Sequence, residues 1–293
     1  MKRTFAIAAL LLSFGAAAGE PTLKPFVLAA REQGEVEAVA AATKAKIEAA
    51  GFQVAGTYSP YPGAVVLSVT SDALKTEAAR TETGGYAAAQ RVTITKVGEE
   101  VQVAFTNARY MAPAYRLAGD LAPIATALEG ALGRAEEYGP ADGKTAKDLR
   151  RYHYMVGMQY FDEPSLLAKY ATHAEAVDAV EAGLAAHRGG ASKVYRIDLP
   201  GESQTVFGVA LTDGCSGDAF IMKEIDFKPL RSTAHLPYEV LVTGGNVYAL
   251  HARFRIAMNF PDLKMMGSHS FMNIRCAPGA IEGALKSVAA TAR

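Results

Sequence analysis

Hydrophobic positions near the amino end of the chain change their spacing partway along, which predicts a helix followed by two strands. Between Val36 and Ile47 the core-facing positions recur at steps of three and four, as on one face of a helix. Gly51 then supplies a helix stop, because glycine tolerates the left-handed backbone that commonly ends a helix. Apolar and polar residues alternate over Phe52–Val54 and again over Val65–Val69, with a turn at Tyr58–Gly63 between them.

The same pattern recurs about 140 positions later, as expected for an internal repeat. The helical spacing returns over Val177–Leu184, and the stop returns at Gly189-Gly190. Alternation resumes over Tyr195–Leu199, and the closing helices of both halves contain the run Glu-Gly-Ala-Leu, at 129–132 and 282–285. These correspondences, which keep the same order, predict an internal duplication.

The predicted fold is α+β: two tandem β-α-β4-α repeats with antiparallel sheets, each covered by helices, packed as a pseudo-dimer with a groove between or beneath the sheets. The opening strands are expected at Phe26–Ala30 and at Tyr152–Phe161. The predicted segments are a signal peptide (1–19), a first repeat (20–135), a linker (136–150) and a second repeat (151–293).

The first residues have the pattern of a secretory signal. Lys2 and Arg3 precede the apolar run Phe5–Phe14, and Ala16–Ala18 provides small residues at a cleavage site. We therefore expect a periplasmic or secreted protein, with an uncleaved anchor as the alternative. No later segment approaches the length of a membrane helix, so no stable membrane insertion is expected.

The amino-acid composition and net charge indicate which kinds of binding partner are expected. The chain of 293 residues is 50% hydrophobic and 20% charged, and its formal net charge is zero. A neutral chain has no long-range attraction for phosphate backbones, so no nucleic-acid partner is expected. The oligomeric state is left open.

Export also affects the interpretation of the cysteines. Cys215 and Cys276 are the only two, and an oxidising compartment favours a disulfide between them. A pair of soft metal ligands and a free thiol are the alternatives.

Two short motifs resemble the domain of unknown function 302 family. Leu236-Pro237 leads into Tyr238–Val242 and then Gly244–Tyr248, and the first half is similar at Gly51–Val54. The resemblance implies compact α+β domains in which a terminal helix covers a sheet, and it brings no agreed activity. The chain departs from the family pattern at Tyr238, where a cysteine often stands, and the first half lacks Leu-Pro.

A cationic segment is the first candidate site. We predict a strand in which His251, Arg253 and Arg255 alternate with apolar residues and so share one face. Two guanidiniums and an imidazole on one face could bind a carboxylate or an oxyanion. The alternative is a solvated strand face with surface ion pairs.

A methionine-rich run is the second candidate site. If 265–272 is helical, then Met265, His269 and Met272 share a face, and thioether and imidazole ligands suit Cu(I). Copper is therefore a possible cofactor. Methionine also fills irregular gaps in protein cores, which is the alternative interpretation.

Catalysis has the weakest support, because no Gly-x-Ser-x-Gly elbow, His-Glu-x-x-His helix or phosphate-binding glycine loop is present. The expected function is a non-enzymatic binding or accessory protein for a small anionic ligand. The alternatives are a copper-binding protein and an enzyme whose residues converge only in space.

Overall fold

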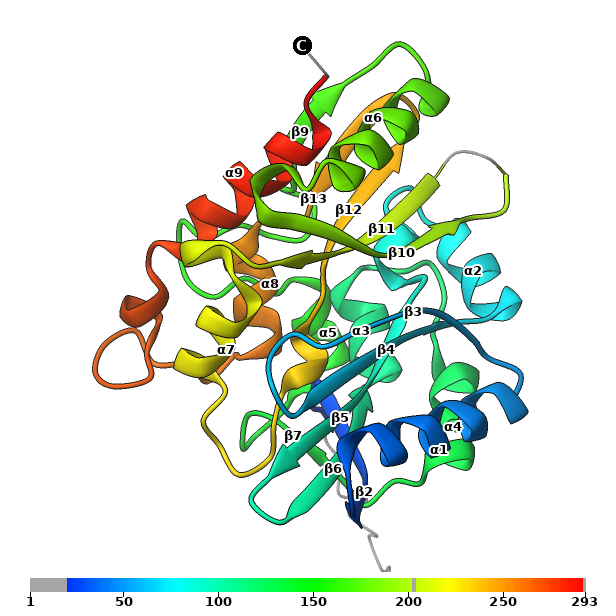
Figure 1. Cartoon of the computed structure of the whole chain (residues 1–293), viewed down its shortest axis with the longest axis vertical. Helices are drawn as coiled ribbons and strands as arrows, with labels where there is room; N and C mark the ends of the chain where they lie inside the picture. Colours follow the sequence, from blue (N-terminus) through cyan, green and yellow to red (C-terminus); the bar gives the residue numbers. More distant parts are fainter. Residues whose placement is uncertain (1–19, 202–203, 292–293) are drawn as a thin grey trace, which may run out of the picture.

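The computed structural model describes residues 20–201 and 204–291, so the predicted signal peptide (1–19) lies outside the described residues. Two antiparallel sheets dominate the described chain, and Figure 1 shows them in adjacent parts of the molecule. The α+β class with antiparallel sheets is confirmed. A short additional ladder pairs β1 (Thr22–Leu23) with β8 (Lys144–Thr145).

The first sheet has six strands in the order β3-β4-β5-β6-β2-β7. Their bounds are β2 Phe26–Gln33, β3 Gln53–Tyr58, β4 Ala64–Thr70, β5 Gln90–Val97, β6 Glu100–Thr106 and β7 Glu136–Tyr138. The second sheet has five strands in the order β10-β11-β12-β13-β9. Their bounds are β9 Ser165–Lys169, β10 Ala191–Asp198, β11 Gln204–Leu211, β12 Tyr238–Thr243 and β13 Asn246–Ala249.

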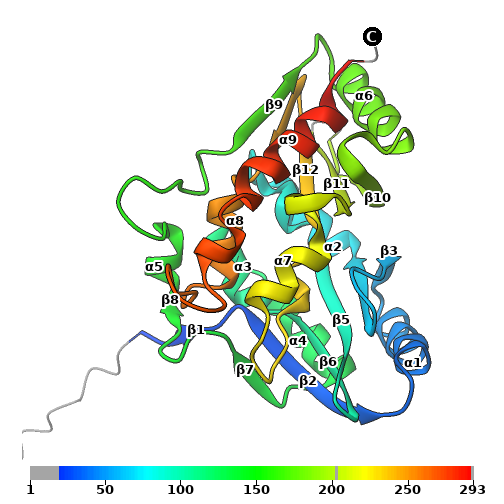
Figure 2. The same ribbon diagram turned by 60° about the vertical axis from the view of Figure 1, so that its left-hand side comes forward.

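The helices follow the strands in a similar order in both halves. The first half contains α1 Val36–Ala49, α2 Asp72–Ala79, α3 Ala108–Ala114 and α4 Ala122–Leu132. The second half contains α6 His173–Ala185, α7 Asp218–Ile225, α8 Ala252–Asn259 and α9 Ala277–Ala289. Helices α1 and α4 pack together against the first sheet, and α6 and α9 pack together against the second (Figure 2).

Local sequence explains where several helices begin and end. Val36 and Ile47 lie on the buried stripe of α1, and Gly51 has the expected positive φ of 86° beyond its end. The Ser71 hydroxyl caps α2 by accepting from the Leu74 amide at 3.2 Å, and Thr172 caps α6 in the same way.

Several predicted elements differ from the structure. Tyr152–Phe161 is not a strand but a series of turns and bends, and the second sheet instead gains β9. The segment containing His251, Arg253 and Arg255 is not a strand but the start of helix α8. The segment 136–150, which was predicted as a linker, contains β7, β8 and α5 (Ala146–Arg150).

The two sheets approach each other at their edge strands, β3 and β10. Each strand has a bulge in its pairing, at Ala55 in β3 and at Val194 in β10. A Cβ at Gly56 would lie 2.1 Å from the Val194 carbonyl oxygen, so only glycine permits this approach.

In each half, a connecting segment lies against the sheet of the other half. The 3₁₀ turn η1 (Gly84–Ala87) lies against the second sheet, where the Gly85 amide donates to Gln204 Oε1 at 3.0 Å. In return, η4 (Thr233–His235) and the residues before it lie against the first sheet. The core therefore includes contacts that join the two sheets.

The predicted disulfide is confirmed: Cys215 and Cys276 are bonded, with their Cα atoms 5.8 Å apart. The bond joins η3 (Gly214–Ser216) to the start of α9. Among residues 20–201 and 204–291, no helix is long and apolar enough to cross a membrane.

Candidate anion-binding site

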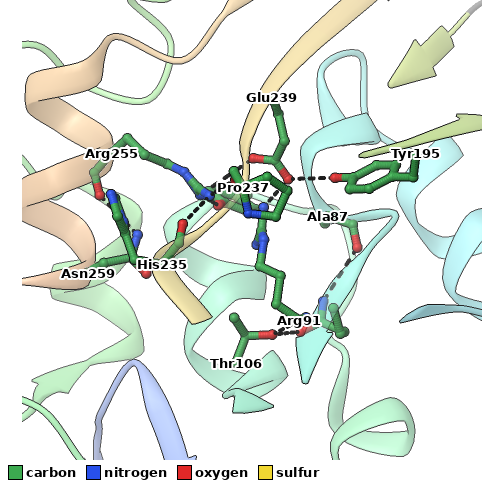
Figure 3. A network of polar contacts seen from close by, with 11 residues as sticks. Ala87, Arg91, Thr106, Tyr195, His235, Pro237, Glu239, Arg255 and Asn259 are labelled. Atoms are coloured by element: carbon green, nitrogen blue, oxygen red, sulfur yellow. Dashed lines mark hydrogen bonds and ion pairs between the residues drawn. The ribbon is translucent and has the colours of Figure 1, made fainter. Parts of the chain in front are cut away.

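A buried ionic network joins the two halves of the chain (Figure 3). Arg91 of β5 forms an ion pair with Glu239 of β12, and Arg255 of α8 lies 3.4 Å from the other carboxylate oxygen. The three side chains are only 1–2% exposed. Because solvent is excluded, this network can hold the halves together but cannot meet a dissolved ligand without local opening.

Neighbouring groups complete the network. The Arg255 guanidinium donates to the carbonyl oxygens of His235 and Pro237, at 2.7 and 2.8 Å. The Tyr195 hydroxyl donates to Glu239 at 3.1 Å. Burial, followed by the nearby Glu239 charge, raises the pKa of Tyr195 well above its usual value, so this hydroxyl keeps its proton and acts as a donor.

The cationic residues predicted from sequence do not form a common face. His251 caps α8, and its Nδ1 accepts from the Arg253 amide at 3.2 Å. Successive helical positions turn by about 100°, so Arg253 and Arg255 point to different sides. Arg253 is exposed, whereas Arg255 is buried in the ionic network.

The predicted copper ligands are not on one helical face either. The backbone at Met265–Ser270 is irregular, and His269 has a positive φ of 52°. The Met272 amide donates to the Met265 carbonyl at 3.2 Å, which brings these two backbones together. However, Met265 lines one hollow beside Arg253, and His269 lines another beside Lys264.

A different hollow brings basic side chains together from both halves. It has a volume of about 540 Å³ and lies where α7 and the segment after it pass over the turn between β3 and β4 and the end of β5. Its basic and hydroxyl-bearing lining residues are Tyr61, Thr95, Lys96, Lys223 and Arg231.

Hydrogen bonds fix the segment that carries Arg231. Gln102 of β6 accepts from the Arg231 amide at 3.0 Å and donates to the Pro229 carbonyl at 2.9 Å. Just beyond, the Thr233 hydroxyl lies 2.7 Å from Tyr61 Oη and 2.9 Å from Thr95 Oγ1. The backbone around Arg231 is therefore held in place by the first sheet.

The basic residues of this hollow have no carboxylate partner within the described ranges. Lys96, Lys223 and Arg231 form no ion pair there. The Arg231 guanidinium donates to the Asp226 carbonyl oxygen, and Lys96 donates to two backbone carbonyls at 3.2 Å. These acceptors are neutral, and the three basic side chains outnumber the single carboxyl group of the hollow, that of Asp226, so the hollow attracts anions.

Asp226 is the one carboxyl group among the residues that line this hollow. Burial raises its pKa to about 7, although the Ser232 amide and the Arg231 charge favour the ionised form. The carboxyl therefore loses its negative charge as the pH falls through about 7, and its repulsion of a bound anion then disappears.

Sequence reasoning missed this hollow. Lys223 and Arg231 lie more than 100 positions from Lys96, and no local motif connects them. In comparisons with known proteins, no family model, curated protein or solved structure matches this chain.

Proposed function

We propose that this chain is an exported, non-enzymatic binding or accessory protein for a small anionic ligand. The observation that carries the proposal is the hollow in which Lys223 and Arg231 have no carboxylate partner in the described chain. Arg231 offers paired donors suited to a carboxylate or an oxyanion, and Lys223 adds a mobile charge. The hydroxyls of Tyr61 and Thr95 are additional polar groups at the same place.

Export is supported by the disulfide, because such bonds are typical of proteins in oxidising compartments. The pattern of the first 19 residues agrees with it. The proposed site replaces the His251–Arg255 face, while the class of ligand remains the one that the sequence favoured.

We also propose that the chain is a tandem duplication packed as a pseudo-dimer, related to the domain of unknown function 302 family. The first five strands of the six-stranded sheet follow the same order as the five strands of the other sheet, which supports the duplication, as do the matching bulges in the edge strands. Arg91 and Glu239 occupy matching positions, since each is the second residue of its sheet's third strand. An ion pair between matching positions requires that the two copies differ in sequence there. Identical residues at both positions would bring like charges together.

The binding proposal predicts where an anion perturbs the protein. In a titration of the isotope-labelled mature protein with citrate at pH 6, amide resonances of residues 222–233 and of Thr95 and Lys96 should shift in a saturable way. At that pH the Asp226 carboxyl is largely protonated and does not oppose the ligand. Shifts confined to His251–Arg255 would move the site to α8, and the absence of saturable shifts would contradict anion binding.

A further inference from the structure

A second hollow adjoins the segment Asp226–Ser232 and has a different chemical character. Its volume is about 500 Å³. Asp226 and Phe227 line both this hollow and the proposed anion-binding hollow beside Lys223 and Arg231. Tyr138, Phe227 and Phe260 give it aromatic walls. It is therefore suited to a ligand with an apolar body.

Two buried acceptors among its lining residues have no hydrogen-bond partner in the part of the chain that the structure describes. These are Asp226 Oδ2 and Asn259 Oδ1, and the two residues are 7% and 2% exposed. An unsatisfied buried acceptor destabilises the folded protein, so a ligand that supplies donors to both would recover this loss.

The orientation of both acceptors is fixed by their other atoms. Asp226 Oδ1 accepts from the Ser232 amide at 2.8 Å, and Asn259 Nδ2 donates to the Arg255 carbonyl at 2.9 Å. Exchanging the amide oxygen and nitrogen of Asn259 would break the hydrogen bond that it now makes, whereas the two Asp226 oxygens are equivalent, so one of them is left unpaired in either orientation. The unpaired oxygens are thus a constant feature of the hollow. A ligand with N–H donors would give them hydrogen-bond partners.

The charged side chains that line the hollow are balanced in number. Lys228 is paired with Asp262, and neither Asp226 nor Lys264 has an ion-pair partner in the described chain, so a cation is attracted by the ionised Asp226 carboxylate and not by the hollow as a whole. The Phe227 ring is 46% exposed and stacks on His269 with centroids 4.4 Å apart. The negative potential over an exposed aromatic face attracts a cation.

We propose that this second hollow binds an organic ammonium ion, whose N–H groups donate to Asp226 and Asn259 while its apolar body packs against Phe227 and Phe260. Both acceptor oxygens are shielded from solvent, so the ligand displaces part of the wall, and Phe227 is its most exposed aromatic member. The anion site uses Lys223 and Arg231 instead, although Asp226 and Phe227 line both hollows.

Phenethylamine is a suitable probe, with phenethyl alcohol as its uncharged counterpart. At pH 8 the Asp226 carboxyl is largely ionised, because its pKa is about 7, and an alkylammonium remains protonated as lysine does. The amine should bind at least about tenfold more tightly than the alcohol, with amide shifts centred on residues 226–232 and 259–264. Equal affinities for the two probes, or shifts centred elsewhere, would overturn the proposal.

Asp226→Asn is the decisive variant, because it keeps the shape of the side chain but places a donor where the unpaired acceptor was. We expect it to remove the tenfold preference for the amine. The matched control is Asp218→Asn, since Asp218 is also buried with an unpartnered oxygen but does not line this hollow. The preference should persist in this control and in Lys223→Gln.

A second variant keeps the test decisive if Asp226→Asn fails to fold. Phe227→Ala removes a half-exposed ring and should weaken amine binding several-fold without unfolding the protein. Unchanged amine affinity in Phe227→Ala, or a preference retained in folded Asp226→Asn, would rule the site out.

Discussion

Replacing Glu239 with alanine is expected to lower the free energy of unfolding by about 3–5 kcal/mol. The Glu239 carboxylate is 1% exposed and lies between the guanidiniums of Arg91 and Arg255. Without it, two buried positive charges face each other with no anion between them. Urea unfolding of the parent and the variant, monitored by circular dichroism, measures the difference.

Glu181→Ala is the matched control for this substitution. Glu181 also pairs with two basic residues, Lys193 and Arg196, but its side chain is 26% exposed on the surface. Its removal should cost no more than about 1 kcal/mol. Similar losses in Glu181→Ala and Glu239→Ala would mean that the buried network does not hold the halves together as described.

Removing the disulfide is the second change with a large expected effect. The bond between Cys215 and Cys276 spans a sequence separation of 61 residues. On the chain-entropy estimate, opening a loop of this length lowers the free energy of unfolding by about 4 kcal/mol. The double variant Cys215→Ser/Cys276→Ser should therefore unfold at a lower urea concentration than the parent.

Reduction provides the control for the two serine substitutions. Dithiothreitol should shift the unfolding midpoint of the parent toward that of the double variant and should leave the double variant unchanged. A parent whose midpoint is insensitive to complete reduction would show that this bond contributes little to stability.

The sequence pattern was most informative where an element is buried on one side. Helix α1 was predicted because its buried residues have a clear period against a polar face. Strands β3 and β4 were predicted from the alternation of residues and the turn between them, although β3 is only partly buried and β4 is buried on both faces. Helix α8 was missed because it is buried almost all around: seven of its eight residues are inaccessible. A short helix without a polar stripe has no 3.6-residue pattern, and its alternating charges were interpreted as a strand.

The candidate site was difficult to predict for a related reason. The hollow depends on the segment 226–233 lying across the first sheet, and that position is set by Gln102, Tyr61 and Thr95 through side-chain hydrogen bonds. Such long-range contacts leave no periodic signal in a single sequence. The disulfide was predicted correctly because only two cysteines were available to pair.

The central claim is that an anionic ligand binds beside Arg231 and not beside the arginine that the sequence pattern favoured. Calorimetric titration of citrate into the parent, Arg231→Gln and Arg253→Gln tests it directly, because both variants remove one guanidinium outside the buried network. A hydrogen bond to a charged group contributes about 1.5–3 kcal/mol, so Arg231→Gln should weaken citrate binding about tenfold or more. Arg253→Gln should bind citrate as the parent does, whereas the reverse ranking of the two variants would contradict the account.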